Sequence, residues 1–390
     1  MSDRKHIYLD NGASTRTAPE VVEAMQPYFD ETYAVASSQF SHTPGILARE
    51  GLDNARKIIA DKLKAENPDE IVFTSGGTEA NNLALKGLAW AETGKKRVIC
   101  SKIEHNSVLH SAQWLAKKGL IEIVTLDVDG EGFVDLNQLE DLVTDQTLLV
   151  SLQHANHEVG TIQAIEAAAQ ICKKKDVLFH TDAQFSFGWL DIDLSKTPVD
   201  LLTVSAHRIH GPKGMGALYI RKGAALEKML HGGYHENNFR SGTENVAGAV
   251  GFGKAVEIIT PNQISTMKEL QQKLIEQIKA DIPGIRINGP EDLSRRVPNN
   301  VNITFDLVEG ESVVLHLDMR GIAVITGSAC FSRSLEPSYV MMAMGFTHER
   351  AHGSIRFSLS RYNTPEEIDQ VVRDCKEVVE SLRKISPLTR

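Results

Sequence analysis

Between Glu70 and Ile220, short runs of apolar and β-branched residues alternate with longer segments whose apolar positions recur at helical spacing. This alternation is typical of a mainly parallel sheet whose faces are covered by helices. Helices are predicted over Thr78–Ala91, Asn106–Lys118 and Ala164–Lys174. Strands are predicted at Ile71–Phe73, Arg97–Cys100, Glu122–Val124, Leu148–Ser151, Val177–His180, Leu202–Val204 and Ala217–Ile220.

The pattern changes in the last third of the chain. A long helical segment begins at Gln263, Asn300–Thr304 has the β-branched alternation of a strand, and a closing helix is predicted over Pro365–Lys384. We therefore predict an α/β protein with a mainly parallel seven-stranded sheet and a second, smaller α+β domain. The large domain is expected over 15–259 and the small domain over 1–14 and 260–390.

Composition narrows the class of protein. The 390 residues are 42% hydrophobic and 24% charged, with a formal net charge of −9, which is enough chain to bury a large core. No basic stripe indicates nucleic acid, and no stretch is long and uncharged enough to span a bilayer. Because the N-terminal residues lack the apolar run of a signal peptide, a cytoplasmic protein is expected.

Cysteine and histidine spacing does not predict a metal site. The four cysteines form no CxxC pair, so neither a disulfide framework nor a zinc knuckle is indicated. Cys100, Cys172 and Cys375 lie in predicted strands or helices, where a small buried thiol is the ordinary interpretation. His154 and His157 have a ligand-like spacing without a clear third ligand, which favours coincidence.

A glycine-rich turn follows the first predicted strand. The segment 74–82 has the sequence TSGGTEANN and opens a predicted helix. The absence of side chains at Gly76 and Gly77 lets backbone amides approach a ligand, and Thr78 adds a hydroxyl at a helix N-terminus, where phosphates bind. By itself this segment is equally compatible with a simple turn.

Polar residues also follow later strands. In open α/β sheets ligands bind beyond the carboxyl ends of the strands, so His105, Asn156, Asp182 and the segment 205–214 are candidates for a shared site. Taken singly, a histidine or aspartate at a strand end is more often a cap or turn residue. Their chemistry therefore depends on what surrounds them.

The segment 205–214, SAHRIHGPKG, resembles the Ser-x-His-Lys-x-x-Gly-Pro-Lys-Gly stretch of the NifS/IscS-type cysteine desulfurases. Further similar segments run in order from Tyr8-Leu9-Asp10 to residues 354–358, SIRFS, so the resemblance covers almost the whole chain. It implies the class V aminotransferase-like fold, called fold type I, with pyridoxal 5'-phosphate (PLP) as cofactor. It also implies L-cysteine as substrate, a homodimer, and sulfur delivery to a scaffold or acceptor protein of IscU type.

The resemblance implies roles for individual residues. His105 would stack on the PLP ring and take part in proton transfer, while Asp182 would pair with the pyridine nitrogen and keep the ring an electron sink. Asn156 would lie near the ring and the substrate carboxylate, and Arg356 would bind that carboxylate bidentately. Further cofactor contacts are implied at Gly77, Thr78, Gln184, Ser205, His207 and Thr243, the last reaching the phosphate of the neighbouring subunit.

Arg208 departs from the family pattern, because the family has the PLP-binding lysine at this position. A guanidinium stays protonated and is a poor nucleophile, so it neither attaches PLP covalently nor moves the substrate proton readily. PLP, if bound, is expected to be held non-covalently. We hypothesise that Arg208 pairs with an anion in the site, whether the cofactor phosphate, a buffer ion or the Asp182 carboxylate.

Two further departures accompany Arg208. The family's glutamine three residues after the aspartate is Phe185 here, and glutamine comes one place early as Gln184. If this segment is extended, the shift turns the glutamine side chain away from the site. Around Val35 the usual Gly-Asn-Pro is lost, which changes the dihedral angles open to the loop.

Cys330 is the candidate sulfur acceptor. It lies among small residues in 326–332, TGSACFS, and by resemblance its thiol would attack the sulfur of bound cysteine and carry it as a persulfide. The length of the segment resembles the long-loop class, which delivers sulfur directly to scaffold or carrier proteins. An iron–sulfur cluster ligand is a second role open to Cys330.

Three functions stay open at this point. The first is a cysteine desulfurase that gives L-alanine and a persulfide on Cys330, for iron–sulfur cluster or thio-cofactor assembly, with turnover weakened by Arg208. The second is a catalytically impaired paralogue, or an engineered variant, that binds a scaffold, a cluster or a persulfide. The third is another PLP-dependent activity such as a lyase, which is disfavoured because it has no use for Cys330.

Overall fold

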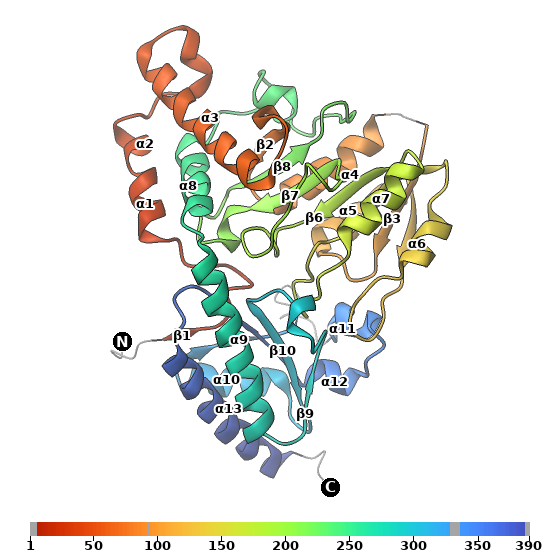
Figure 1. Ribbon diagram of the computed structural model, residues 1–390, viewed down its shortest axis with the longest axis vertical. Helices are drawn as coiled ribbons and strands as arrows, with labels where there is room; N and C mark the ends of the chain where they lie inside the picture. Colours follow the sequence, from red (N-terminus) through yellow and green to blue (C-terminus); the bar gives the residue numbers. More distant parts are fainter. Residues whose placement is uncertain (1–5, 92–93, 328–335, 387–390) are drawn as a thin grey trace.

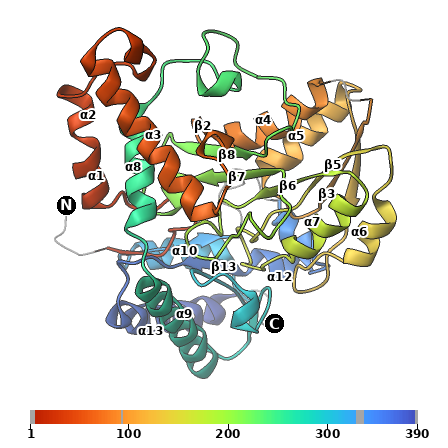
Figure 2. The ribbon, with the colours of Figure 1, turned by 45° about the horizontal axis from the view of Figure 1, so that its top comes forward.

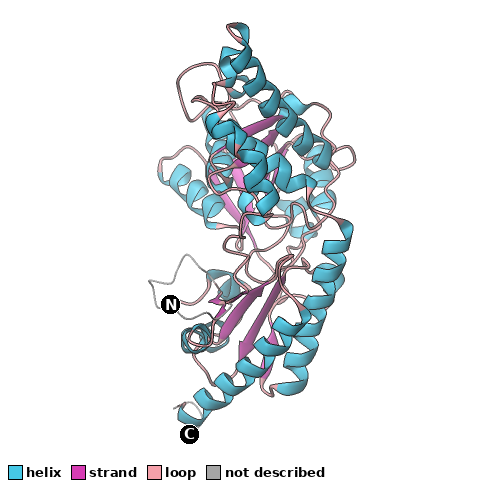
Figure 3. Cartoon of the chain, turned by 90° about the vertical axis from the view of Figure 1, so that its left-hand side faces the viewer, coloured by secondary structure: helices cyan, strands magenta, loops and turns pink. Residues whose placement is uncertain are grey.

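The computed structural model describes residues 6–91, 94–327 and 336–386. The described residues form a seven-stranded sheet in the upper half of Figure 1, a four-stranded sheet below it and a separate pair of short strands. In the side view of Figure 3 the two sheets are separate, and long helices run along the outer side of the lower one. The described residues thus contain a larger and a smaller sheet, whereas the two domains with boundaries at 14/15 and 259/260 stay a prediction.

The upper sheet has seven strands in the order β2-β8-β7-β6-β5-β3-β4. Strand β8 is antiparallel to both of its neighbours, and the other pairs are parallel. The strands are β2 (Ile71–Thr74), β3 (Arg97–Ser101), β4 (Glu122–Leu126), β5 (Thr147–Ser151), β6 (Leu178–Asp182), β7 (Leu201–Ser205) and β8 (Gly216–Ile220). All seven predicted strands are confirmed, with small shifts at their ends.

Both faces of this sheet are buried, because alternate residues along a strand point to opposite sides. In β2, Val72 packs into one apolar cluster while Ile71 and Phe73 pack into the other. Helices α4 and α5 cover the first face, and α3, α7 and α8 cover the second, as Figure 2 shows. The helices of this half are α1 (Pro19–Met25), α2 (Pro27–Asp30), α3 (Thr43–Leu63), α4 (Gly77–Trp90), α5 (Asn106–Lys117), α6 (Leu136–Leu142), α7 (Ile165–Lys174) and α8 (Val246–Glu257), with short 3₁₀ turns η1 (Ala36–Phe40), η2 (Pro68–Glu70), η3 (Ala206–Arg208) and η4 (Glu236–Asn238).

The lower sheet is antiparallel, in the order β12-β13-β10-β9. Strand β1 pairs in parallel with β11, so residues 7–8 lie against the C-terminal part of the chain. The strands are β1 (Ile7–Tyr8), β9 (Ile285–Ile287), β10 (Asn300–Phe305), β11 (Ile322–Ala323), β12 (Ile325–Thr326) and β13 (Ser354–Ser358). The helices are α9 (Pro261–Asp281), α10 (Gly310–Asp318), α11 (Tyr339–Ala343), α12 (His348–His352) and α13 (Pro365–Ile385), with the 3₁₀ turn η5 (Leu293–Arg295).

Local sequence explains where the long lower helices begin. Thr260 accepts a hydrogen bond from the backbone of Gln263, whose side chain accepts one in return from the Thr260 backbone, and Pro261 occupies the first turn of α9. Thr364 caps α13 in a similar position before Pro365. The predicted beginning of α13 is confirmed, and α9 begins two residues before the predicted Gln263.

The parallel strands place their carboxyl ends at one edge of the upper sheet, facing the lower sheet. The polar segments after β2, β3, β5, β6 and β7 therefore converge there. None of the described helices is long and apolar enough to cross a membrane. The cytoplasmic location stays a prediction.

Candidate functional site

The glycine-rich turn leads from β2 into α4 and forms a cradle for an anion. Gly76 has a positive φ of 149°, and a side chain added there would meet open space. Gly216 packs directly on Gly76 and pairs with Ser205, so the end of β7 lies next to the first turn of α4. The Ser205 hydroxyl is buried and makes no hydrogen bond with the described residues, while Thr78 is exposed. A helix N-terminus and a buried hydroxyl that makes no hydrogen bond with the described residues favour a phosphate at this turn.

Asp182 lies at the end of β6 with its carboxylate held by three donors. Asn81 Nδ2 donates to Oδ2 at 2.7 Å, Gln184 Nε2 donates to the same oxygen at 3.0 Å, and the Gln184 backbone N–H donates to Oδ1 at 3.0 Å. Asn81 also donates to Ser107 Oγ at 2.7 Å. Asn81 was not among the candidates chosen from the sequence. Its position on the inner face of α4, the helix after the glycine-rich turn, could have indicated a role in the site.

Gln184 does not turn away from the site. Strand β6 ends at Asp182, and the chain turns immediately, so the condition of an extended backbone is not met. The Gln184 carboxamide instead lies against Gly77, where an added side chain would come within 1.8 Å of its oxygen. Phe185 is buried, and its ring faces Arg208.

Arg208 closes the short turn η3 after β7. Its guanidinium carbon lies 5.6 Å from the centroid of the Phe185 ring, within the range of a cation–π contact. Burial lowers the pKa of the neighbouring His207 to about 3, and the positive charge of Arg208 adds to the effect. The site therefore combines a permanent cation with a neutral imidazole. Pairing of Arg208 with an anion stays a prediction.

His105 follows β3 and caps α5. Its Nδ1 lies 2.8 Å from Ser107 Oγ and accepts from the Ser107 backbone N–H at 3.2 Å. Burial lowers the pKa of His105, with Asp182 opposing the shift and Arg208 reinforcing it. The ring of His157 stands edge-on to that of His105, with centroids 5.2 Å apart, and burial holds the pKa of His157 well below its usual range.

Asn156 organises the turn after β5. Its Oδ1 accepts hydrogen bonds from the backbone N–H groups of Glu158 and Val159, both at 2.9 Å, and its Nδ2 donates to the Ile103 carbonyl at 3.1 Å. This leaves one N–H of the amide for a ligand. A structural role for Asn156 is therefore visible, and its predicted contacts with ring and substrate stay predictions.

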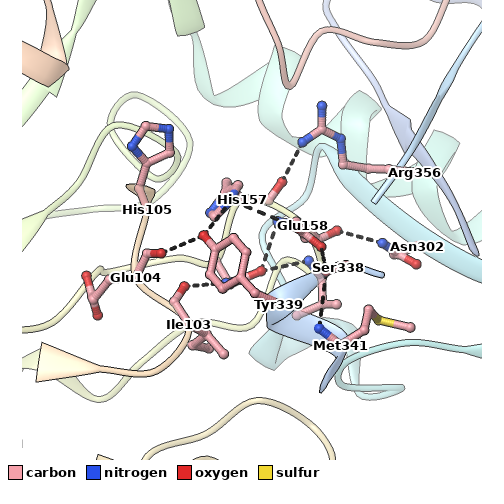
Figure 4. A network of polar contacts seen from close by, with 12 residues as sticks. Ile103, Glu104, His105, His157, Glu158, Asn302, Ser338, Tyr339, Met341 and Arg356 are labelled. Atoms are coloured by element: carbon pink, nitrogen blue, oxygen red, sulfur yellow. Dashed lines mark hydrogen bonds and ion pairs between the residues drawn. The ribbon is translucent and has the colours of Figure 1, made fainter. Parts of the chain in front are cut away.

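Arg356 comes from β13 of the lower sheet and reaches toward the same region (Figure 4). Its Nη2 donates to Asp10 Oδ1 at 2.8 Å, and its Nη1 donates to the His157 carbonyl at 3.0 Å. The side chain is almost fully buried, and its Nε has no hydrogen-bond partner among the described residues. A guanidinium held in this way is positioned to bind a carboxylate.

Thr243 is exposed and lines a cavity of about 240 Å³ together with Ser75 and Arg240. Arg240 Nε donates to Glu79 Oε1 at 2.9 Å, which fixes this segment beside the first turn of α4. The cavity thus adjoins the phosphate cradle. Contact of Thr243 with the phosphate of a neighbouring subunit stays a prediction.

Cys330 lies outside the described residues. The residues on either side are described: Gly327 is buried at the end of β12, and Ser338 is buried at the beginning of α11. The other cysteines, Cys100, Cys172 and Cys375, are buried, and burial raises the pKa of each thiol to about 12. Their interpretation as inert apolar residues therefore agrees with their surroundings.

Sequence reasoning missed two buried carboxyls next to the site (Figure 4). Burial raises the pKa of Glu104 to about 8, with Asp182 adding to the shift and donors at Ser101 and Gln153 opposing it. Burial raises the pKa of Glu158 to about 7, and hydrogen bonding from Ser338 and the charge of Arg356 oppose the shift. Neither position carried a signal in the sequence, because the burial depends on residues far away along the chain.

Comparisons with known proteins place this arrangement in a family. A family model described as aminotransferase class-V matches residues 7–371. The chain belongs to the class-V aminotransferase family. This family member is similar to the cysteine desulfurase IscS of Clostridium botulinum, at 45% identity over 388 residues that cover 98% of this chain and 97% of the relative. It is similar to the cysteine desulfurase IscS of Methanosarcina thermophila, at 46% identity over 392 residues that cover 100% of this chain and 95% of the relative.

Solved structures of similar proteins support the same family and fold. A structure described as a NifS-like protein superimposes on this class-V protein with a TM-score of 0.89 at 37% identity, covering 97% of this chain and 100% of that one. Another, described as SspA in complex with cysteine, gives a TM-score of 0.81 at 34% identity, covering 92% of this chain and 100% of that one. The predicted family and the predicted fold are confirmed.

PLP is the cofactor of class-V aminotransferases and of the cysteine desulfurases among them, which confirms the cofactor prediction at the level of the family. The residues of this class-V protein fit it at two points. The unused Ser205 hydroxyl and the open space at Gly76 fit a phosphate, and the buried Asp182 carboxylate fits a pyridinium nitrogen. The prediction that Arg208 occupies the position of covalent attachment stays a prediction.

Proposed function

We propose that this protein is a cysteine desulfurase that moves sulfur from L-cysteine to Cys330, leaving L-alanine and a persulfide. The observation that carries the proposal is the convergence of Asp182, His105 and Ser205 from the upper sheet with Arg356 from the lower one. This gives a site with a cofactor side and a carboxylate-binding side. The reaction balances without an outside oxidant: the Cβ–S bond of L-cysteine breaks, an S–S bond forms to Cys330, and Cβ gains a hydrogen to give alanine, so that carbon is reduced as sulfur is oxidised to the persulfide level.

In this proposal each residue of the site has its own role. Bound PLP supplies an electron sink for the substrate. Asp182 would hold the ring nitrogen in its protonated form, and Thr78, Ser205 and His207 would hold the phosphate. Arg356 binds the substrate carboxylate through the guanidinium that Asp10 orients, and the neutral His105 is available to accept or return a proton.

Arg208 weakens this activity without removing the binding site. A guanidinium cannot replace the amine that attaches PLP and moves the substrate proton, so cofactor binding is non-covalent and turnover is slow. The second candidate function is an impaired paralogue or engineered variant that binds a scaffold protein, an iron–sulfur cluster or a persulfide through Cys330. The cation–π contact of Arg208 with the buried Phe185 favours it, because the substituted side chain is packed into the site.

The homodimer is part of the proposal, and an exposed apolar surface supports it. Phe29, Tyr33 and Phe40 are 62%, 75% and 91% exposed, on α2, on the loop after it and on η1. Exposed aromatic side chains close together in sequence are typical of a surface that another chain covers. We propose a second copy of this chain as the partner, with Thr243 exposed for its phosphate, and an acceptor protein of IscU type for the sulfur.

The test starts with the purified protein. Cofactor absorbance is recorded with and without added PLP, and alanine and sulfide are measured after addition of L-cysteine and a thiol reductant. Slow, PLP-dependent release of alanine and sulfide in equal amounts, lost in Cys330→Ser when a protein acceptor is supplied, supports the desulfurase. No alanine at any PLP concentration, in a folded protein, favours the binding function.

A further inference from the structure

Strand β2, which leads into the glycine-rich turn, lies at an edge of the seven-stranded sheet, and an ion pair covers its free side. The Phe73 N–H donates to Glu236 Oε2 at 2.7 Å. Arg56 Nη1 donates to the carbonyl of Ile71, two residues earlier in the strand. Because alternate residues of a strand turn their backbone groups to the same side, these two bonds satisfy the edge as a neighbouring strand would. We call Arg56 with Glu236 the edge pair.

The edge pair is buried and doubly hydrogen-bonded. Arg56 Nη1 donates to Glu236 Oε2 at 2.7 Å, and its Nη2 donates to Oε1 at 2.8 Å, which is the paired geometry of a guanidinium and a carboxylate. Arg56 is 4% exposed and Glu236 is 8% exposed. The pair joins α3 to η4 across 180 positions of the chain. Removing either partner would leave a buried charge unpaired.

The backbone that presents Glu236 is strained. Glu236, Asn237 and Asn238 have φ values of 45°, 52° and 67°, in the left-handed region, whereas the other non-glycine residues of positive φ among the described residues stand singly in the sequence. Asparagine tolerates this region, but a glutamate there raises the free energy of the folded state. Such strain persists where the surrounding structure holds it, and it is concentrated at binding sites. Here the edge pair holds it.

The same segment reaches the glycine-rich turn a second time. Arg240 Nε donates to Glu79 Oε1 at 2.9 Å, and Glu79 Oε2 accepts from the Ser75 backbone N–H at 2.8 Å. The backbone N–H groups of Phe73 and Ser75, just before and within the turn, are therefore both held by carboxylates that the segment 236–240 supplies or fixes. The position of the turn thus depends on this segment.

We propose that Glu236 is a positioning residue for the cofactor phosphate: by closing the free edge of β2 together with Arg56, it fixes the strand end from which the glycine-rich turn departs. The assignment deepens the proposed function and rests on it, because it takes the phosphate of PLP as the anion at the turn. Glu236 acts through the turn and not by touching the phosphate, which a carboxylate repels. A shift of the turn would move Thr78 away from the phosphate, whereas Asp182, at the end of β6, lies on a different strand.

The experiment separates phosphate binding from ring binding and needs no turnover. Pyridoxine 5'-phosphate and pyridoxine differ only in the phosphate, and neither has an aldehyde that reacts with lysine side chains. Isothermal titration calorimetry measures the dissociation constant of pyridoxine 5'-phosphate for the wild type, Glu236→Gln and Arg56→Lys. Pyridoxine is measured by displacement of the phosphate form, so that weak binding is still detected. The ratio of the two constants isolates the contribution of the phosphate.

A matched control is available in Glu70→Gln, at the other end of β2. Glu70 is a carboxyl of similar burial, 7% exposed, and it too accepts backbone N–H groups, from Asn67 at 3.2 Å and from Lys222 at 3.0 Å. Its replacement disturbs the same strand at the end that does not lead into the turn.

The expected results differ between the two ligands. In Glu236→Gln the affinity for pyridoxine 5'-phosphate should fall about tenfold, the value of one charged hydrogen bond, while the affinity for pyridoxine stays unchanged. Arg56→Lys keeps the charge without the paired hydrogen bonds, so it should lose several-fold for the phosphate form alone. In Glu70→Gln both affinities stay at the wild-type level.

Unchanged affinity for pyridoxine 5'-phosphate in Glu236→Gln, with the circular dichroism of the wild type, would overturn the proposal. An equal loss for both ligands, or an equal loss in Glu70→Gln, would also overturn it, because the whole site would then be disturbed. The same holds if the wild type binds both ligands equally, since no phosphate would then bind at the turn. If Glu236→Gln does not fold, Arg56→Lys decides. Failure of the desulfurase proposal is distinguishable, because it appears as missing alanine while the preference for the phosphate form remains.

Discussion

The two sides of the site match the expected family pattern to different extents. On the upper-sheet side, the expected lysine and glutamine positions hold Arg208 and Phe185, and Gln184 lies against Gly77. On the lower-sheet side, Arg356 is held by Asp10 and the His157 carbonyl in a geometry ready for a carboxylate. On the roles predicted for these residues, the cofactor side lacks its attachment chemistry, whereas the substrate side has its carboxylate-binding group.

The largest effect is expected from restoring the amine on the cofactor side. Arg208→Lys should raise alanine formation from L-cysteine by about 100-fold or more, the usual contribution of a positioned acid–base group. Arg208→Gln is the control, because it removes the charge without supplying an amine, and it should stay slow. Steady-state alanine production with saturating PLP measures both. If alanine formation does not increase in Arg208→Lys, the low activity would be assigned to Phe185 and the loop around Val35.

A somewhat smaller effect is expected on the substrate side. In the Arg208→Lys background, Arg356→Ala should lower kcat/KM for L-cysteine by about 100-fold, since it removes a charged hydrogen-bond partner and leaves Asp10 unpaired. The loss should fall mainly on KM, and Arg356→Lys should recover part of it. A loss confined to kcat would contradict carboxylate binding by Arg356.

A smaller effect is expected from restoring a glutamine at position 185 on the cofactor side. Phe185→Gln places a hydrogen-bonding group where the family has one, and it is expected to tighten PLP binding about tenfold, the value of one good hydrogen bond in a buried site. Fluorescence titration with PLP measures the dissociation constant. The control is Phe185→Leu, which keeps the position apolar. Equal affinities in the two variants would show that Gln184 already serves the ring.

The smallest expected effect is on the pH dependence of stability. The pKa of Glu104 is about 8 in the folded protein against an ordinary value of 4.5. Below pH 4.5 the group is protonated in both states and costs nothing, and as the pH rises toward 8 only the unfolded chain releases the proton. Stability is therefore lost over that window. Glu104→Gln should melt about 2 °C higher than the wild type at pH 8 and no higher at pH 4.5.

Scanning fluorimetry between pH 4.5 and pH 8 tests the sign of this pH dependence of stability. His154 and His180 act in the opposite direction, because burial lowers the pKa of each to about 4 and folding then weakens as the pH falls below their ordinary value of 6.5. Since they are unchanged in Glu104→Gln, they cancel in the difference between the two proteins. A difference in melting temperature that does not vary with pH would contradict the raised pKa of the buried Glu104 carboxyl.

The sequence by itself determined the seven strands of the upper sheet, strand β10, the helices α4, α5, α7, α9 and α13, and the edge of the sheet at which the site forms. Buried parallel strands are short apolar runs, helix starts carry recognisable caps such as Thr260, and the carboxyl ends of parallel strands must meet at one edge. Asp182 and His105 lie at that edge, and their predicted roles came from the family resemblance. The departure at Arg208 was likewise visible only because the surrounding segment resembles that of the family.

Only the tertiary structure decided how the side chains combine. Gln184 faces the site because the chain turns after Asp182, which a strand-based prediction could not anticipate. Arg356 and Asp10 are 346 residues apart, and Glu158 and Ser338 are 180 residues apart, so no local pattern predicts either contact. Burial shifts pKa values through the loss of water around a group, and that loss depends on every element packed against it.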